Sequence, residues 1–215
     1  TQDPALTAKV LQITNNMFGR SQQSLTSISD AITKIGIDTL TTIVLTAELF
    51  AYQPKIANFS LVEAQQHSLA TAKFAATLVS SELKQQAMLA GLLHDIGKLL
   101  LFELDPTLTN HYFKQSSKAS SDVMLEQKVF STDHCQIGAY LLHLWSFPYE
   151  LIQAVLQHHS PNQLLSDKFA VAQAVYLANA LLKENEPDEK FVQHFQLAEK
   201  LTTLKSAAQR HLVAA

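Results

Sequence analysis

A long helical segment with a clear start constrains the fold of this chain more than any other feature. Ser60-Leu61-Val62-Glu63 has the S-x-x-E form of a capping box, in which the serine side chain accepts a hydrogen bond from the backbone N–H three residues on. The run at 62–83 contains neither Gly nor Pro and is mostly apolar on one face. This pattern predicts a long helix that packs on a core.

Other helix boundaries follow the same chemistry. We expect helices over 5–14, 28–35, 38–52, 134–145, 149–159 and 167–185, with shorter ones near 106–111, 191 and 201. Their starts carry capping residues, namely Asp3-Pro4, Asp38, Asp105-Pro106, Asp133, Pro148 and Ser166, and Gly36 ends the second helix. Only 5 Gly and 6 Pro are present, and no segment alternates as a strand would. The sequence predicts an all-α protein.

Length and composition indicate one domain. A chain of 215 residues that is 47% hydrophobic can bury a substantial core, and neither a low-complexity linker nor a repeat interrupts it. We predict a single domain over 1–215, with a smaller helical half at 1–54 and a helical core at 55–215. The chain begins at a helix start, which is what the loss of a preceding segment would leave.

Charge and cysteine usage narrow the partners and the compartment. The formal net charge is −3 and no run of Lys and Arg occurs, so neither nucleic acid nor an anionic membrane surface is an expected partner. No apolar segment approaches the roughly 20 residues of a membrane helix. The start TQDPALTAKV is unlike a signal peptide, and the single cysteine, Cys135, cannot form an internal disulfide. We expect a cytoplasmic protein.

Five histidines interrupt apolar helical segments or their ends, and a carboxylate stands beside one of them. Imidazole nitrogen and carboxylate oxygen together suit borderline divalent ions such as Zn, Fe, Mn or Ni. Side chains from several helices can converge on an ion in the interior of a bundle. We therefore predict a site for one or two ions, built from His67, His94, Asp95, His134, His158 and His159.

The segment GLLHDIGKLLL gives this predicted site its geometry. Adjacent residues on a helix point about 100° apart, so His94 and Asp95 can reach one ion only near a bend or from the edge of a groove. The two glycines of the segment let neighbouring backbone approach closely. Asp95 has two oxygens and could bridge two ions. Lys98, one turn beyond His94, would place a positive charge where a phosphate oxygen could sit.

Ordinary structural roles compete with the metal-site interpretation. A single buried histidine is more often a hydrogen-bonded core residue than a ligand, although the doublets HD and HH favour a site. Glu63 could point at the same site, but its capping-box position explains it adequately. Cys135 is expected to be a small buried hydrophobe. The remaining histidines are expected to be solvated, namely His111, His143, His194 and His211.

Taken together, these motifs resemble the HDOD domain, a branch of the HD superfamily of metal-dependent phosphohydrolases. The resemblance is carried, in order, by VLQITNNMFG, ISDAITKIGIDTLTTIVL, His67-Ser68, GLLHDIGKLLL, DHCQIGAYLLHLWSFP and LQHHSP, and it covers nearly the whole chain. It implies a bacterial protein with an all-α, HD-domain-like helical bundle and a smaller N-terminal helical half.

Similarity to the related HD-GYP phosphodiesterases implies roles for single residues. The six candidate ligands match positions that hold metals there, and Lys98 matches a phosphate-contacting lysine. HD enzymes usually close their site with a late Asp, whereas this chain has Asn179, whose neutral amide is a poor replacement for an anionic ligand. HHSP also lacks the acidic residue and the Gly-Tyr-Pro segment of the HD-GYP branch. These departures predict weaker metal binding.

Two functions remain open. We expect a signal-transduction or regulatory module that binds a protein partner or a small ligand and is not an enzyme. The alternative is a metal-dependent phosphohydrolase acting on a phosphate ester or nucleotide, in which His94 and Asp95 hold the metal and Lys98 stabilises the phosphoryl charge. Asn179 favours the first function, because hydrolysis needs a complete, well-held metal centre.

Overall fold

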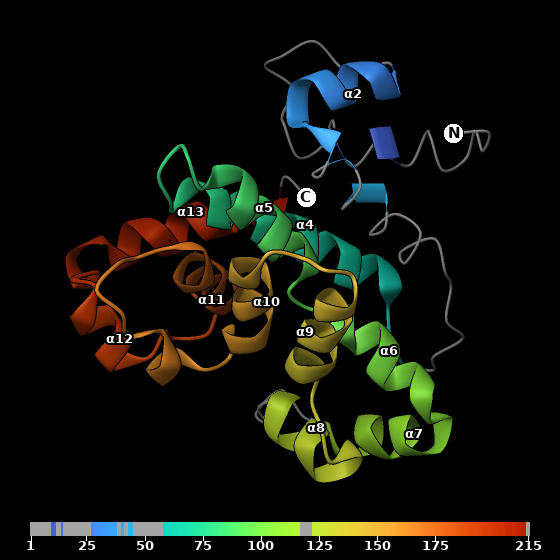
Figure 1. The fold of residues 1–215 in the computed structure, drawn as a ribbon. Helices are drawn as coiled ribbons and strands as arrows, with labels where there is room; N and C mark the ends of the chain where they lie inside the picture. Colours follow the sequence, from blue (N-terminus) through green and yellow to red (C-terminus); the bar gives the residue numbers. More distant parts are fainter. Residues whose placement is uncertain are drawn as a thin grey trace. The chain divides into compact units, whose positions relative to one another are not determined.

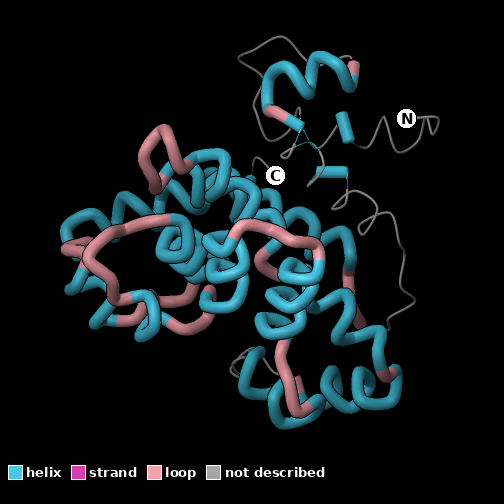
Figure 2. The backbone as a smooth tube through the Cα atoms, viewed as in Figure 1, coloured by secondary structure: helices cyan, strands magenta, loops and turns pink. Residues whose placement is uncertain are grey.

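The computed structural model describes residues 10, 11, 14, 27–37, 40, 43, 44, 58–116 and 122–213. Within these residues every regular element is a helix and no strand occurs, which confirms the all-α expectation (Figure 2). Much of the expected helices at 5–14 and 38–52, with their starts at Asp3-Pro4 and Asp38, lies outside the described residues. No helix in the described part of the chain has the length and apolar character that a membrane-spanning segment needs.

The chain divides into two compact units, Thr1–Gln53 and Pro54–Ala215. In the first unit, α2 (Ile28–Ile35) begins at Ser27, whose hydroxyl accepts a hydrogen bond from the Asp30 N–H at 3.1 Å. The helix ends at Gly36, which has a positive φ of 80° and donates its N–H to the Ile32 carbonyl. That glycine therefore ends the helix as its type predicts. The single domain over 1–215, with halves at 1–54 and 55–215, stays a prediction.

The second unit is a bundle of helices that contains all the candidate ligands (Figure 1). The pairs α4 and α5, α6 and α9, α9 and α10, and α10 and α11 pack against one another, and α7 and α8 lie together at one end. The elements are α4 (Leu61–Thr77), α5 (Lys84–Leu93), α6 (Ile96–Leu104), α7 (Pro106–Gln115), α8 (Asp122–Phe130), α9 (His134–Leu144), α10 (Tyr149–Gln157), η1 (Pro161–Leu164), α11 (Val171–Leu182), α12 (Glu189–His194), η2 (Ala198–Lys200) and α13 (Leu201–Val213).

Capping residues predicted from the sequence set the starts of three helices. The Ser60 hydroxyl accepts from the Glu63 N–H at 3.3 Å, and Glu63 itself is exposed. Asp105 accepts from two N–H groups in the first turn of α7, the nearer at 2.8 Å. Asp133 accepts from the Gln136 N–H at 2.9 Å at the start of α9. The cap at Ser60 is thus confirmed. Asp133 fixes the backbone just before His134.

Several predicted helix boundaries were wrong, and the short helix predicted near 201 is α13, with 13 residues. The helix predicted over 62–83 ends at Thr77. There the Leu78 N–H donates to the carbonyl three residues back, that of Ala75, and this tighter turn ends the α-helix. The helix predicted from 167 begins at Val171 instead. Ser166 does not cap it, since its hydroxyl accepts from the Gln173 amide and donates to the Lys168 carbonyl.

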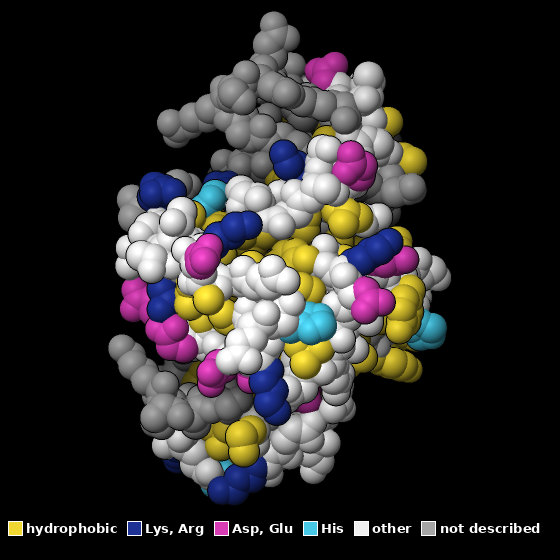
Figure 3. Space-filling view, turned by 90° about the vertical axis from the view of Figure 1, so that its left-hand side faces the viewer, with side chains coloured by type: hydrophobic (Ala, Val, Ile, Leu, Met, Phe, Trp, Pro, Cys, Tyr) yellow, Lys and Arg dark blue, Asp and Glu magenta, His cyan; other side chains and the backbone are white. Residues whose placement is uncertain are grey.

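Apolar clusters pack the helices against one another around the buried histidines and Asp95. Leu93, Leu142 and Val155 join α5, α9 and α10 in one buried cluster. A second cluster, formed by Leu101, Phe102, Tyr112 and Leu125, joins α6, α7 and α8. On the face shown in Figure 3, acidic and basic side chains are interspersed with hydrophobic ones. The clusters fix α8 against α6 and α7, which matters for the carboxylates that α8 carries.

A close crossing of α6 and α9 at two glycines sets the position of His134. A Cβ on Gly97 would overlap the His134 carbonyl oxygen and would lie 2.7 Å from the Gly138 backbone nitrogen. A Cβ on Gly91 would lie 2.6 Å from the Ala72 Cα on α4. Both glycines of GLLHDIGKLLL therefore serve close backbone approach, as predicted.

We predict that Gly97→Ala lowers the free energy of unfolding by at least about 2 kcal/mol, because the added methyl group forces α6 and α9 apart. Chemical denaturation followed by circular dichroism measures this change. Thr203→Ala, at an exposed position of α13, is the control and should stay within about 0.5 kcal/mol of the unchanged protein. Equal stability of Gly97→Ala and Thr203→Ala would contradict the close crossing.

Candidate metal centre

The HD doublet lies at a break between two helices. α5 ends at Leu93 and α6 begins at Ile96, so His94 and Asp95 occupy the turn between them. His94 is fully buried and Asp95 is 9% exposed. The bend that adjacent residues need in order to reach one place is therefore present, as predicted.

Asp95 is the point on which the other side chains converge. Its Oδ1 lies 3.2 Å from His134 Nε2 and 3.5 Å from His158 Nε2, and its Oδ2 lies 3.5 Å from His94 Nε2. The two nitrogens of His134 and His158 are 3.2 Å apart. These separations between candidate ligand atoms are close to those found around a single ion with metal–ligand bonds of about 2 Å.

All six predicted ligands belong to two groups whose candidate ligand atoms lie within 4.8 Å of one another. One group contains Asp95, His134, His158 and His159, and the other contains His67, His94 and Asp95. Asp95 is common to both, which is the arrangement expected of a carboxylate that bridges two ions. Four separate parts of the fold supply these residues, namely α4, the α5–α6 turn, α9 and the end of α10.

Hydrogen bonds on the far side of three imidazole rings fix which nitrogen faces Asp95. His94 Nδ1 is 2.7 Å from the Gly91 carbonyl, and His158 Nδ1 is 2.7 Å from the Val155 carbonyl. His134 Nδ1 is 2.6 Å from Glu126 Oε2. A carbonyl or carboxylate oxygen can only accept, so each Nδ1 carries a proton and each Nε2 is the nitrogen that faces the centre, where a neutral imidazole would present its lone pair.

Lone pairs that face one another in a buried space need a positive charge between them. Among the described residues, His94 Nε2 and His159 Nε2 are buried and make no hydrogen bond. Buried polar atoms normally have partners, and leaving them without one is costly. A divalent ion satisfies neutral imidazoles and a carboxylate at once, so the residues present fit such an ion.

Charge states in the cluster suit metal ligation. Burial opposes ionisation of Asp95, but electrostatic interactions with His94, Lys98 and Lys183 keep its pKa well below the ordinary value. Burial lowers the pKa of His67, His94 and His159, so these imidazoles stay neutral.

The pKa values of His134 and His158 shift in the opposite direction, and for His158 the effect of burial is outweighed by the charge of Cys135 and a hydrogen bond with Asp95. Burial and the charge of Lys98 act to lower the pKa of His134, yet hydrogen bonds with Asp95, Cys135 and Glu126 raise it well above the ordinary value. A proton on His134 therefore balances the negative charge of its two carboxylate neighbours in the metal-free protein. A metal ion that binds there must displace this proton.

Glu126 is a functional candidate that the sequence did not indicate. It is fully buried on α8, and its Oε2 accepts both from His134 Nδ1 at 2.6 Å and from the His134 backbone N–H at 2.9 Å. A carboxylate behind a histidine ligand orients the ring and raises its basicity. Nothing in DVMLEQKVF distinguishes this glutamate from a solvated one.

Lys98 and Asn179, both singled out in the sequence, lie at the cluster. Lys98 Nζ donates to Asp95 Oδ2 at 2.9 Å, and Asp95 and Asp122 raise its pKa although burial acts to lower it. Asn179 Oδ1 is 2.9 Å from His67 Nε2, which links α11 to α4. The position of the missing late Asp is therefore next to a candidate ligand.

The other polar residues behave mostly as expected. Cys135 is buried, with its Sγ 3.6 Å from His134 Nε2. His111, His143 and His194 are exposed. His211 was expected to be solvated but is half-buried, with its ring 5.3 Å from that of Phe74. Neither these four histidines nor Glu63 belongs to a ligand group among the described residues.

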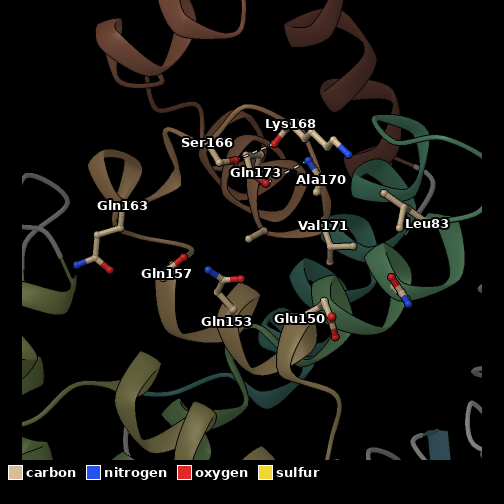
Figure 4. A pocket seen from close by; sticks show the side chains of 12 residues that line it. Leu83, Glu150, Gln153, Gln157, Gln163, Ser166, Lys168, Ala170, Val171 and Gln173 are labelled. Atoms are coloured by element: carbon tan, nitrogen blue, oxygen red, sulfur yellow. Dashed lines mark hydrogen bonds between the residues drawn. The ribbon is translucent and has the colours of Figure 1, made fainter.

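The pockets lined by described residues include two on the bundle. One, with a volume of about 340 Å³, is lined by His158, His159 and Asn179 together with acidic residues that include Glu186. A second, of about 250 Å³, is lined by glutamine side chains and by none of the six candidate ligands, and Figure 4 shows Gln153, Gln157 and Gln173 around it. The first pocket gives the cluster an opening, whereas the second is a separate polar hollow.

A family model matches three quarters of the chain, from its first residue to Pro161. The model described as the HDOD domain matches residues 1–161. The chain belongs to the HDOD family. A search of curated proteins found no match for this HDOD chain.

Solved structures share the fold at low sequence identity. A Shewanella amazonensis protein described as a candidate phosphohydrolase has a TM-score of 0.70 and 21% identity, over 99% of this chain and 81% of its own. A second protein from that organism, described as a candidate metal-dependent phosphohydrolase, has a TM-score of 0.62 and 21% identity, over 93% and 72%. A candidate signal transduction protein from Marinobacter aquaeolei has a TM-score of 0.72 and 20% identity, over 99% and 51%.

We predict that Glu126→Ala weakens divalent metal binding by roughly 10–100-fold, because His134 loses the group that orients it. Glu126→Gln keeps an acceptor oxygen without the charge and should lose less affinity. Calorimetric titration of the metal-free protein with Mn²⁺ measures both variants, and Glu199→Gln, at an exposed position, is the control. Unchanged affinity in Glu126→Ala would contradict a role for Glu126 in supporting a metal ligand.

Proposed function

We propose that this HDOD chain is a non-catalytic regulatory module whose helical core holds a divalent metal centre and binds a protein partner or a small ligand. Asn179 carries the proposal. Its amide oxygen lies 2.9 Å from His67 Nε2, at the place where a catalytic centre would have a charged carboxylate. A neutral amide lowers the metal affinity and leaves the site more positively charged than a carboxylate would. It therefore favours a structural ion over a catalytic ion.

The engagement of Lys98 supports the same function. Its ammonium group donates to Asp95 and lies 3.5 Å from Asp122, and its side chain is only 12% exposed. A lysine that stabilises a phosphoryl group in a transition state has to face the ligand. Here the charge of Lys98 is already neutralised by two carboxylates, so the resting site is closed to a phosphate ester.

A metal ion would contribute to the fold of such a module. It would supply positive charge to Asp95 and to lone pairs that come from α4, the α5–α6 turn, α9 and the end of α10. Because these parts are distant in sequence, a change in metal occupancy or ligand contact at the cluster would alter the packing of several helices at once. That property suits a module that passes a state to a partner.

A metal-dependent phosphohydrolase is the second candidate. It is favoured by the grouping of all six candidate ligands and by the uniform orientation of three Nε2 atoms toward Asp95. The metal would supply an activated water and charge stabilisation. The pocket next to His158 and His159 has room for a small ligand, although its acidic lining opposes the approach of an anion.

We predict that the Mn²⁺- or Fe²⁺-loaded protein hydrolyses phosphomonoesters, nucleotides and cyclic di-nucleotides no faster than Asp95→Ala, because the centre lacks a charged ligand at Asn179. Product release in steady-state assays measures this. Asn179→Asp restores the carboxylate, and Asn185→Asp, which adds the same charge elsewhere in the pocket, is its control. Metal-dependent turnover that is lost in Asp95→Ala would support the phosphohydrolase and overturn the non-catalytic module.

A further inference from the structure

The two oxygens of Asp95 face different partners. Oδ1 lies 3.2 Å from His134 Nε2 and 3.5 Å from His158 Nε2, both of which are candidate ligand atoms. Oδ2 lies 3.5 Å from His94 Nε2 and accepts a hydrogen bond from Lys98 Nζ at 2.9 Å. One side of the carboxylate is therefore surrounded by groups that can bind a metal, whereas the other side already contacts a positive charge.

The ammonium group of Lys98 is held at Asp95 by a second carboxylate. Asp122 Oδ2 lies 3.5 Å from Lys98 Nζ, and it also lies 3.6 Å from the Nζ of Lys183, which follows the last residue of α11. The Lys98 side chain is only 12% exposed. A divalent ion bound to Asp95 Oδ2 would lie next to this ammonium group, and like charges repel strongly in a buried site. Lys98 therefore opposes an ion on the Oδ2 side.

A second group engages a candidate ligand on that side. His67, His94 and Asp95 form one of the two ligand groups, which we call the Oδ2 group. His67 Nε2 lies 2.9 Å from the side-chain amide of Asn179. An amide oxygen accepts from a protonated Nε2, and an amide N–H occupies the lone pair of an unprotonated one. In either arrangement this nitrogen of His67 has no free lone pair for a metal.

The other ligand group keeps its atoms available to one ion. It is formed by Asp95, His134, His158 and His159, and we call it the Oδ1 group. The Nε2 atoms of His134 and His158 are 3.2 Å apart, and both face Asp95 Oδ1. His159 Nε2 is buried and makes no hydrogen bond. The shortest contacts of these atoms are with one another, so a single ion can satisfy all of them at once.

We propose that the centre holds a single divalent ion, bound by the Oδ1 group. Lys98 and Asn179 take the place of a second ion, because Lys98 supplies positive charge to Asp95 Oδ2 and Asn179 engages His67. His94 Nε2 remains free on the Oδ2 side, and one ligand atom is too few to hold an ion. The inference rests on the proposed function, because it specifies the metal content of the regulatory module and the four residues that bind the ion.

Counting the ions bound by the full chain tests the proposal. Titration of the metal-free protein with Mn²⁺, followed by electron paramagnetic resonance, distinguishes an isolated ion from a pair of ions that share a bridging carboxylate. We expect one Mn²⁺ per chain and the spectrum of an isolated ion. Two ions per chain with an exchange-coupled spectrum would overturn the proposal, and so would the absence of bound Mn²⁺.

The roles of Lys98 and Asn179 are tested by opening the second position. The double variant Lys98→Met/Asn179→Asp removes the ammonium group and adds a carboxylate, so we expect it to bind a second Mn²⁺ and to give an exchange-coupled spectrum. The matched control, Lys190→Met/Asn162→Asp, makes the same charge changes at exposed positions and should keep one ion. Circular dichroism melts establish that both variants fold, and Lys98→Gln replaces Lys98→Met if the first variant does not. One ion in both folded variants would overturn these roles.

Two matched histidine variants locate the ion. We expect His158→Ala to lower the Mn²⁺ affinity at least about tenfold more than His67→Ala does, because only His158 belongs to the Oδ1 group. Calorimetric titration measures both affinities. Equal losses, or a larger loss in His67→Ala, would place the ion in the Oδ2 group and would overturn the proposal.

Metal counting and hydrolysis assays separate two kinds of failure. Two bound ions without hydrolysis would remove the single-ion assignment and leave the non-catalytic function intact. Hydrolysis that is lost in Asp95→Ala, by a protein that binds one ion, would remove the non-catalytic function and leave the single-ion assignment intact.

Discussion

The buried negative charge of Asp95 determines how the helices of the second unit are arranged. Taking a carboxylate out of water costs several kcal/mol unless positive or polar groups surround it. Lys98, His94, His134 and His158 provide that surrounding, each within 3.5 Å. The carboxylate can be held only where the α5–α6 turn meets α9 and α10. The break after Leu93 and the close crossing at Gly97 follow from this requirement.

The groups that bond the Nδ1 side of three candidate ligands determine how their imidazole rings are oriented. Main-chain carbonyls and Glu126 hold the Nδ1 side of three rings, so the Nε2 lone pairs point inward without needing the ion to orient them. Glu126 also ties α8 to this arrangement, and Asp122 ties it to the lysines on α6 and after α11. Helix α8 therefore contacts both a candidate metal ligand and the two lysines.

Much of the fold and of the ligand set could be predicted from sequence, because both depend on local pattern. Capping residues marked the starts of α4, α7 and α9, and the HD and HH doublets marked four of the six ligands. Glu126, Asp122 and Lys183 could not be found in this way. Each is a charged residue in an ordinary polar stretch, and only partners far away in the chain determine its burial. The prediction that Ser166 caps a helix was wrong for a similar reason, since its hydroxyl bonds the Gln173 side chain instead.

The metal content of the protein tests the central claim most directly. Elemental analysis of protein purified without added metal, followed by titration with Mn²⁺ or Fe²⁺, counts the ions that the cluster holds. The account predicts one or two equivalents in the unchanged protein and a large loss in Asp95→Ala, with both proteins folded by circular dichroism. Less than about a tenth of an equivalent, with no binding on titration, would contradict it.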